Sequence, residues 1–132
     1  MIALAACTPA PKRNQVMGRL PNHSWHGPVG EGSYCAHCTE AGLIKIDLGS
    51  HTRLTTTTCF KDAKTKIGIQ QADAHVEVES GGTELVAIDG QLKVEDCNPS
   101  HFRGTVWASF ADGGRVEASI DSPLKPADPL QQ

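Results

Sequence analysis

The stretch Gly104–Ile120 reads Gly-Thr-Val-Trp-Ala-Ser-Phe-Ala-Asp-Gly-Gly-Arg-Val-Glu-Ala-Ser-Ile, which is two alternating runs around one turn. The apolar positions are Val106, Ala108 and Phe110 before the turn and Val116, Ala118 and Ile120 after it. Because side chains alternate between the two faces of a strand, each set lies on one face. The stretch therefore predicts a β-hairpin, and an isolated hairpin needs further strands to pack against.

The length of the loop decides the register of this hairpin. A two-residue loop would set Phe110 opposite a polar residue and mix the two faces. A three-residue loop, Asp112-Gly113-Gly114, sets Phe110 opposite Val116 and keeps apolar residues together. We therefore expect the three-residue loop, with Gly114 in the left-handed conformation that such loops place last.

The composition extends this prediction to the whole chain. Its 132 residues suffice for one domain, and 39% of them are hydrophobic. There are 13 glycines and 8 prolines, and no segment has a strong helical period. These features favour an all-β fold with many turns. The formal net charge of −3 gives no electrostatic reason to expect nucleic acid or an anionic membrane surface as a partner.

Turn residues divide the chain into three parts. We expect an apolar N-terminus, a tether and an irregular lead-in over residues 1–33. A single β domain should follow over residues 34–121, and a Pro-rich tail over residues 122–132. The domain should hold about seven strands, arranged as an antiparallel meander that forms a small sandwich or a partly closed barrel.

Two further hairpins are expected inside the domain. Around the turn at residues 49–51, Ile46 should face Leu54. Around Asp89-Gly90, the runs at residues 85–88 and 92–94 should pair with each other. Trp107 falls on the polar face of its strand, and we expect it to pack in the core or between sheets, with a ligand or partner surface as the alternative.

Four of the five cysteines lie within the expected domain: Cys35, Cys38, Cys59 and Cys97. In an oxidising compartment four cysteines form up to two disulfides. The register expected around the turn at residues 49–51 brings Cys38 near Cys59, which leaves Cys35 to pair with Cys97. The other reasonable pairing is Cys35 with Cys38 and Cys59 with Cys97.

The fifth cysteine ends the string Leu4-Ala5-Ala6-Cys7, which resembles the lipobox of bacterial lipoproteins. The resemblance covers these four residues and implies that Cys7 carries a lipid. The next stretch, residues 8–15, is typical of a flexible polar tether. Together they imply an exported envelope protein, in the periplasm or anchored to the outer membrane, whose role is structural or the binding of an unknown ligand or envelope partner. A cytoplasmic protein is the alternative.

A Cys/His cluster at residues 23–38 offers a second function. His23, His26, Cys35, His37 and Cys38 supply the nitrogen and sulfur ligands that zinc prefers, so a zinc-binding protein is the alternative. The preferred hypothesis has no cofactor.

A thiol-disulfide oxidoreductase is the third hypothesis, because Cys35 and Cys38 have the C-x-x-C spacing of redox pairs. The motifs of hydrolases and of phosphate-binding loops are missing from the sequence, so we assign no catalytic residue and lean against an enzyme.

Overall fold

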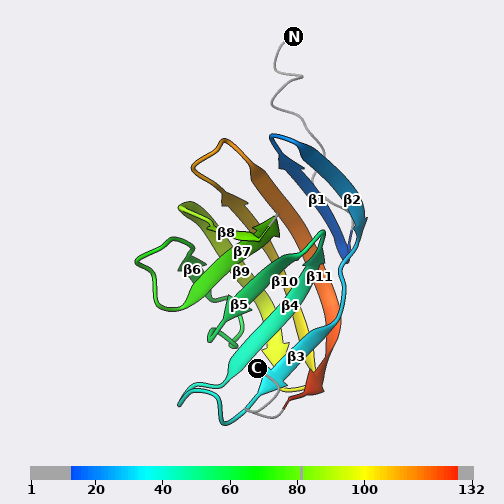
Figure 1. Cartoon of the computed structure of the whole chain (residues 1–132). Coiled ribbons are helices and arrows are strands. Elements are labelled where there is room, and N and C mark those ends of the chain that lie inside the picture. The colour runs from blue at the N-terminus through cyan, green and yellow to red at the C-terminus, as the bar shows by residue number, and fades with distance from the viewer. Residues whose placement is uncertain (1–12, 81, 128–132) are drawn as a thin grey trace.

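A computed structural model describes residues 13–80 and 82–127. Their structure is all-β, as the sequence predicts, and Figure 1 shows one sheet curled into half a barrel. The strands are β1 (Gln15–Leu20), β2 (His23–Pro28), β3 (Gly32–Cys35), β4 (Leu43–Gly49), β5 (Thr52–Thr56), β6 (Lys64–Lys66), β7 (Ala74–Ser80), β8 (Thr83–Val86), β9 (Asp89–Asn98), β10 (His101–Ser109) and β11 (Arg115–Pro126). None of these residues belongs to a helix long and apolar enough to span a membrane.

The strand order corrects the predicted topology. The order is β6-β9-β10-β11-β3-β4-β5-β7-β8, with β1 and β2 attached beside β11. The described residues form eleven strands, where about seven were expected. The sheet is open and curled and is not a sandwich. It is also not a simple meander, because β11 pairs in parallel with β3. The lead-in accounts for part of the difference. Its prolines mark turns and strand ends, so residues 15–28 form the β1–β2 hairpin instead of an irregular segment.

Strand β11 holds the two halves of the sheet together. Along one edge it pairs with β10 from Arg115 to Pro123. Along the other edge it pairs first with β1, at Arg115–Ser119, and then with β3, at Leu124–Pro126. Where the partner changes, the backbone N–H of Asp121 donates to Oδ1 of Asn14 at 3.0 Å, so that donor is also satisfied. The described strands thus run past both ends of the expected 34–121 domain, and β11 takes up residues 122–126 of the expected tail.

The core lies inside the curl, where the alternating apolar residues of both halves meet. Its fully buried members of largest volume are Phe102, Ile44, Ile46, Leu48, Leu54, Leu92, Ile120, Val16, Val76, Val78, Val94 and Val116. The polar residues between them point outward, so the outer face of the sheet is the surface on which side chains can meet ligands.

The Gly104–Ile120 hairpin buries the predicted face, but its loop is shifted from the predicted position. All six of its apolar positions are buried. The loop has three residues, but it is Ala111-Asp112-Gly113, so Ala108 lies opposite Val116 and Phe110 bonds to Gly114. Gly113, with a φ of 91°, takes the left-handed position that we expected for Gly114. A shift of two residues in the pairing keeps each side chain on its face, which is why the burial pattern could not reveal it.

The other two hairpins differ in outcome. Ile46 lies opposite Leu54, as predicted. The predicted pairing around Asp89-Gly90 is wrong, because β8 pairs with β7 and β9 pairs with β10. Between them the chain crosses from one half of the sheet to the other: the N–H of Ala87 donates to Val76 and the N–H of Ile88 donates to Ser109.

Trp25 closes the curl on the side of the β1–β2 hairpin. Its Nε1 donates to the carbonyl of Leu48 at 3.0 Å, which ties β2 to β4. The ring packs over Gly18, the directly paired residue of β1, and a Cβ atom at Gly18 would overlap the ring. Glycine is therefore required at position 18 for this closure.

We predict that Gly18→Ala lowers the free energy of unfolding by about 1–3 kcal/mol, the usual cost of overpacking. Urea denaturation measures it. Gly27→Ala is the matched control on β2, because a Cβ there would meet nothing within 4 Å. Equal stability of the two variants would contradict the proposed role of the Trp25 contact.

Candidate functional site

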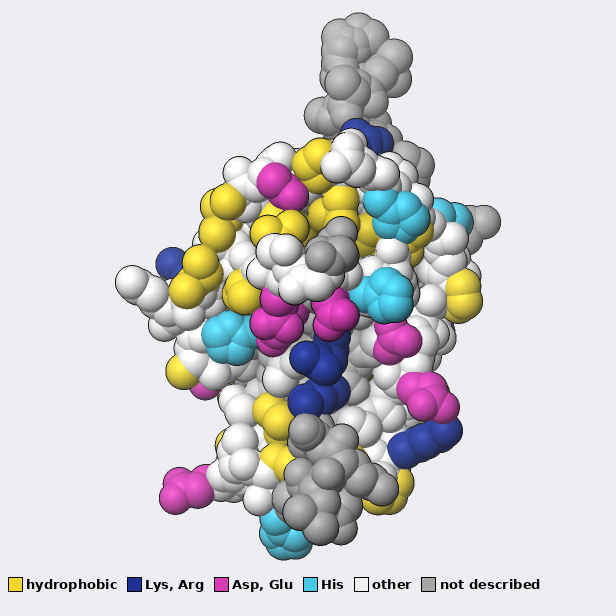
Figure 2. Space-filling view, viewed as in Figure 1, with side chains coloured by type: hydrophobic (Ala, Val, Ile, Leu, Met, Phe, Trp, Pro, Cys, Tyr) yellow, Lys and Arg dark blue, Asp and Glu magenta, His cyan; other side chains and the backbone are white. Residues whose placement is uncertain are grey.

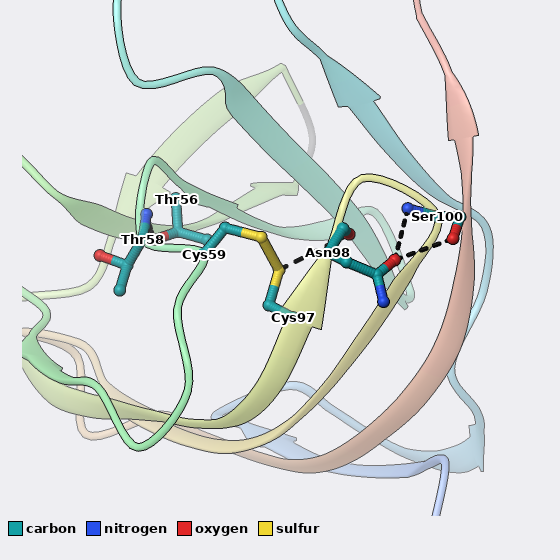
Figure 3. Close-up of a disulfide and its surroundings, with 6 residues drawn as sticks. All are labelled: Thr56, Thr58, Cys59, Cys97, Asn98 and Ser100. Atoms are coloured by element: carbon teal, nitrogen blue, oxygen red, sulfur yellow. Dashed lines mark hydrogen bonds between the residues drawn. A yellow bond between two sulfur atoms is a disulfide. The ribbon is translucent and has the colours of Figure 1, made fainter.

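Two disulfides tie the domain. Cys35 and Cys38, with sulfurs 1.99 Å apart, close the turn between β3 and β4. Cys59 and Cys97, with sulfurs 2.08 Å apart, join the segment after β5 to the end of β9, as Figure 3 shows. The second bond therefore links residues from the two halves of the sheet.

The pairing is the second of the two that the sequence left open. The first, Cys38 with Cys59, assumed that β5 continues past Thr56 beside β4. The chain instead leaves the sheet there, because the Oγ1 of Thr56 donates to Asp73 at 2.7 Å and accepts the N–H of Thr58 at 3.0 Å. This bend carries Cys59 toward β9 and away from Cys38 (Figure 3).

The predicted Cys/His cluster does not assemble around a common point. His23 stacks on Trp25, with ring centroids 5.5 Å apart, on the inner side of β2. His26 lies three residues along the strand, so it faces the other side. The sulfurs of Cys35 and Cys38 are bonded to each other and cannot act as thiolate ligands in this form. Within residues 13–80 and 82–127, no group of three or more His, Cys, Asp or Glu side chains is placed to hold a metal ion.

The C-x-x-C pair lies in a setting unlike that of redox-active pairs. Cys35 is fully buried at the end of β3, and Cys38 is half-buried in the turn that follows. A reactive pair usually has an exposed sulfur at the start of a helix, where the helix dipole lowers the thiol pKa. The environment of this disulfide favours a structural role.

A groove of about 600 Å³ lies on the outer face of the sheet, over the strands from the end of β11 through β3, β4, β5 and β7 to β8. Figure 2 views this face and shows basic side chains at its centre with acidic side chains around them. The charged residues of its lining are Lys45, Arg53, Lys125, Glu31, Asp47, Glu77, Glu79 and Glu84, and His51 lies beside them.

Strand register orders these charges along the groove. Lys45 pairs with Thr55, so it lies near one end of β5. Glu79 donates its N–H to the carbonyl of His51, just beyond the other end, and pairs directly with Glu84. Opposite charges therefore lie at the two ends of the groove, four residues apart along β5, which is about 13 Å at the rise of a strand.

Ion pairs occupy the middle and one side of the groove. Arg53 lies 3.8 Å from Glu77. The Nζ of Lys125 donates to Glu31 at 2.7 Å, and this hydrogen bond holds the pKa of Glu31 below its usual value. Within the described residues, Lys45, Glu79 and Glu84 have no ion pair within 4.0 Å, so their charges are available to a ligand.

Trp107 lies outside the core, contrary to the expected packing. It is half-buried on the outer face of β10, and the guanidinium of Arg115 lies 4.5 Å from the ring centroid. Arg115 also donates from Nε to Glu117 at 2.8 Å, beside a second hollow of about 520 Å³ over β1. The cation covers the exposed ring face, so Trp107 forms a cation–π contact on the surface.

A third polar cluster surrounds Asp121. His101 Nε2 lies 2.6 Å from one of its carboxylate oxygens, and Arg13 Nε lies 3.3 Å from the other. The hydrogen bond from His101, followed by the charge of Arg13, lowers the pKa of Asp121. The cluster holds β10, β11 and the approach to β1 together, which is a structural task.

The chain matches no protein-family model, no curated protein and no solved structure. Its own geometry is therefore what supports a function, and the groove is the best-formed candidate site.

Sequence reasoning missed the groove because its residues come from strands that pair over long distances. Glu77 and Glu79 alternate with Val76 and Val78, a pattern that by itself indicates only the solvated face of one strand. The register of β5 with β7, which sets Glu77 opposite Arg53, brings that face beside Lys45 and Asp47. The available signal was that charged residues occupy the outward positions of several strands.

The two disulfides should contribute unequally to stability. They span sequence separations of 38 and 3 residues, so loop-closure entropy predicts losses of about 4 kcal/mol for Cys59→Ala/Cys97→Ala and about 2 kcal/mol for Cys35→Ala/Cys38→Ala. Denaturation of the two double variants under identical conditions measures the difference. A larger loss from the short loop would contradict this assignment.

Proposed function

We propose that this chain is an exported envelope protein, anchored by a lipid on Cys7, that binds short extended peptides bearing a free amino group and a free carboxylate. The observation that carries the binding role is the groove, with unpaired opposite charges at its two ends. The two disulfides support the export half of the proposal, because such bonds persist in oxidising compartments.

The anchor rests on the lipobox-like string at residues 4–7, which lies outside the described residues. Strand β1 begins at Gln15, so the polar segment from residue 8 leads directly into the folded part. A polar tether, which the composition of this segment predicts, separates a domain from a membrane surface and leaves its groove accessible.

The dimensions of the groove define the ligand. An ammonium group is attracted to Glu79 on β7, and a carboxylate to Lys45 on β4, which lies two side-chain rows away along the strands and on the other side of β5. Four residues of extended chain span about 13 Å, which matches the part of this separation that runs along β5. A tetrapeptide lying over β5 therefore places one terminus beside Lys45 and the other beside Glu79, each on a neighbouring strand about 5 Å to the side.

The proposal that the protein is exported predicts a lipid on Cys7 and disulfide bonds between the four inner cysteines. When the native gene is expressed in a bacterium that carries it, a fatty-acid label should attach to the wild type and be absent from Cys7→Ala. The four inner cysteines should react with a maleimide only after reduction, which a mass shift on a gel measures. An unlabelled protein with reactive thiols in the cytosolic fraction would reject export.

The binding half predicts selective binding of tetra-alanine with free termini. Titration of this peptide into isotope-labelled protein should shift the backbone amide NMR signals of the groove residues, with a Kd on the order of 1 mM. Lys45→Met should weaken binding by about threefold to fivefold, the loss of one exposed charge contact of up to about 1 kcal/mol.

Two controls make this experiment decisive. Tetra-alanine that is acetylated and amidated lacks both charges and should not shift the groove signals. Lys61→Met, in the exposed turn before β6, removes the same charge away from the groove and should leave the affinity unchanged. Equal shifts from the free and blocked peptides, or none from either, would reject the groove as the binding site.

A further inference from the structure

We propose that two copies of this chain form a two-fold symmetric dimer in which β6 of each copy pairs with β8 of the other. The main path of the sheet ends in these two strands: within the described residues, β6 pairs only with β9, and β8 only with β7, while β2, off this path, pairs only with β1. An unpaired strand edge presents N–H and C=O groups that can bond to another strand.

The backbone groups that face outward belong to known residues. Val94 donates to the carbonyl of Ala63, and Ile67 donates to that of Gly90, so the backbone groups of the two residues that flank β6 face β9. Bonding alternates along an antiparallel pair, so Lys64 and Lys66 present their backbone groups to the open side. By the same alternation, since Ala87 donates to Val76, Glu84 and Val86 present theirs on β8.

The two edges have opposite charges. Lys64 lies directly opposite Lys93 on β9, and Glu84 lies directly opposite Glu79 on β7. Like charges in directly opposite positions destabilise a sheet. Within the described residues, none of these four side chains has an opposite charge within 4.0 Å. Pairing β6 with β8 of a second copy sets lysine beside glutamate and relieves both repulsions.

Exposed hydrophobic side chains flank the same two strands. The three large hydrophobic residues that the described surface exposes are Phe60 (64%) and Ile69 (64%), on either side of β6, and Ile88 (48%), just after β8. Figure 2 shows hydrophobic side chains along the margin where Figure 1 places β6 and β8. A second copy would cover this apolar surface.

The two edges converge, which allows a closed dimer. A Cβ atom on Gly68, two residues beyond β6, would lie 3.3 Å from the carbonyl oxygen of Ile88, two residues beyond β8. Because both edges open on the same side of one molecule, a two-fold axis can satisfy both edges of both copies. Lysines on an edge often prevent self-pairing, but that protection requires the same charge on both edges.

Light scattering during gel filtration tests the proposal on the full chain. In low salt the wild type should have twice the 14.0 kDa mass of one chain, and 1 M salt should weaken the dimer because it screens exposed charges. Lys64→Glu/Lys66→Glu and Glu84→Lys should each weaken dimerisation at least tenfold. The triple variant exchanges the charges of the two edges and should restore it.

Arg19→Glu/Arg103→Glu is the control, because it makes the same change in charge as the double lysine variant on exposed outer-face positions away from both edges. It should leave the dimer unchanged. A monomeric wild type at concentrations up to about 1 mM would overturn the proposal. So would a dimer that is insensitive to the edge variants, or a triple variant that stays monomeric.

Discussion

The divided edge of β11 is the constraint on which the rest of the fold depends. A strand has two edges, and β11 uses one for β10 and shares the other between β1 and β3. Two neighbours cannot occupy the same length of edge, so the sheet must separate into two halves that bend around the apolar side chains. The core, the outer groove and the two open ends all follow from this bend.

The ties that maintain the curl differ from one side to the other. On the side of β2, the hydrogen bond from Trp25 to Leu48 joins the halves, and the Cys59–Cys97 bond joins them covalently elsewhere. Between β6 and β8 the described residues form no such strand pairing. Unrelieved like charges gather near this open side, at Lys64 with Lys93 and at Glu79 with Glu84.

Local pairing was predictable from sequence, and long-range pairing was not. The alternation around Gly104–Ile120 predicts the faces correctly, and the turn at residues 49–51 fixes the register of Ile46 with Leu54. The partner of a strand that has no short loop to its neighbour leaves no comparable signal. This explains why the parallel pairing of β11 with β3 was missed. The β8–β9 hairpin was predicted wrongly for another reason: at Ala87 and Ile88 the chain crosses from β7 to β10, so the turn signal at Asp89-Gly90 does not join neighbouring strands.

The candidate site shows the same limit. Individual residues such as Glu77 and Trp107 were visible as polar-face positions, but their neighbours were not. Arg53 reaches Glu77 across a pairing of distant strands, and Arg115 reaches Trp107 across the hairpin whose register the loop alone did not settle. Hairpin geometry favoured one of the two cysteine pairings left open by the sequence. The other pairing forms because the chain bends at Thr56, and no residue pattern predicts this bend.

The place of β11 at the end of the described strands has a consequence for how the chain reaches its fold. Among the described strands, the one that joins β1, β3 and β10 is synthesised last, so the described strands before it cannot complete the core without it. A nascent chain therefore remains without its central strand until residues 115–126 emerge.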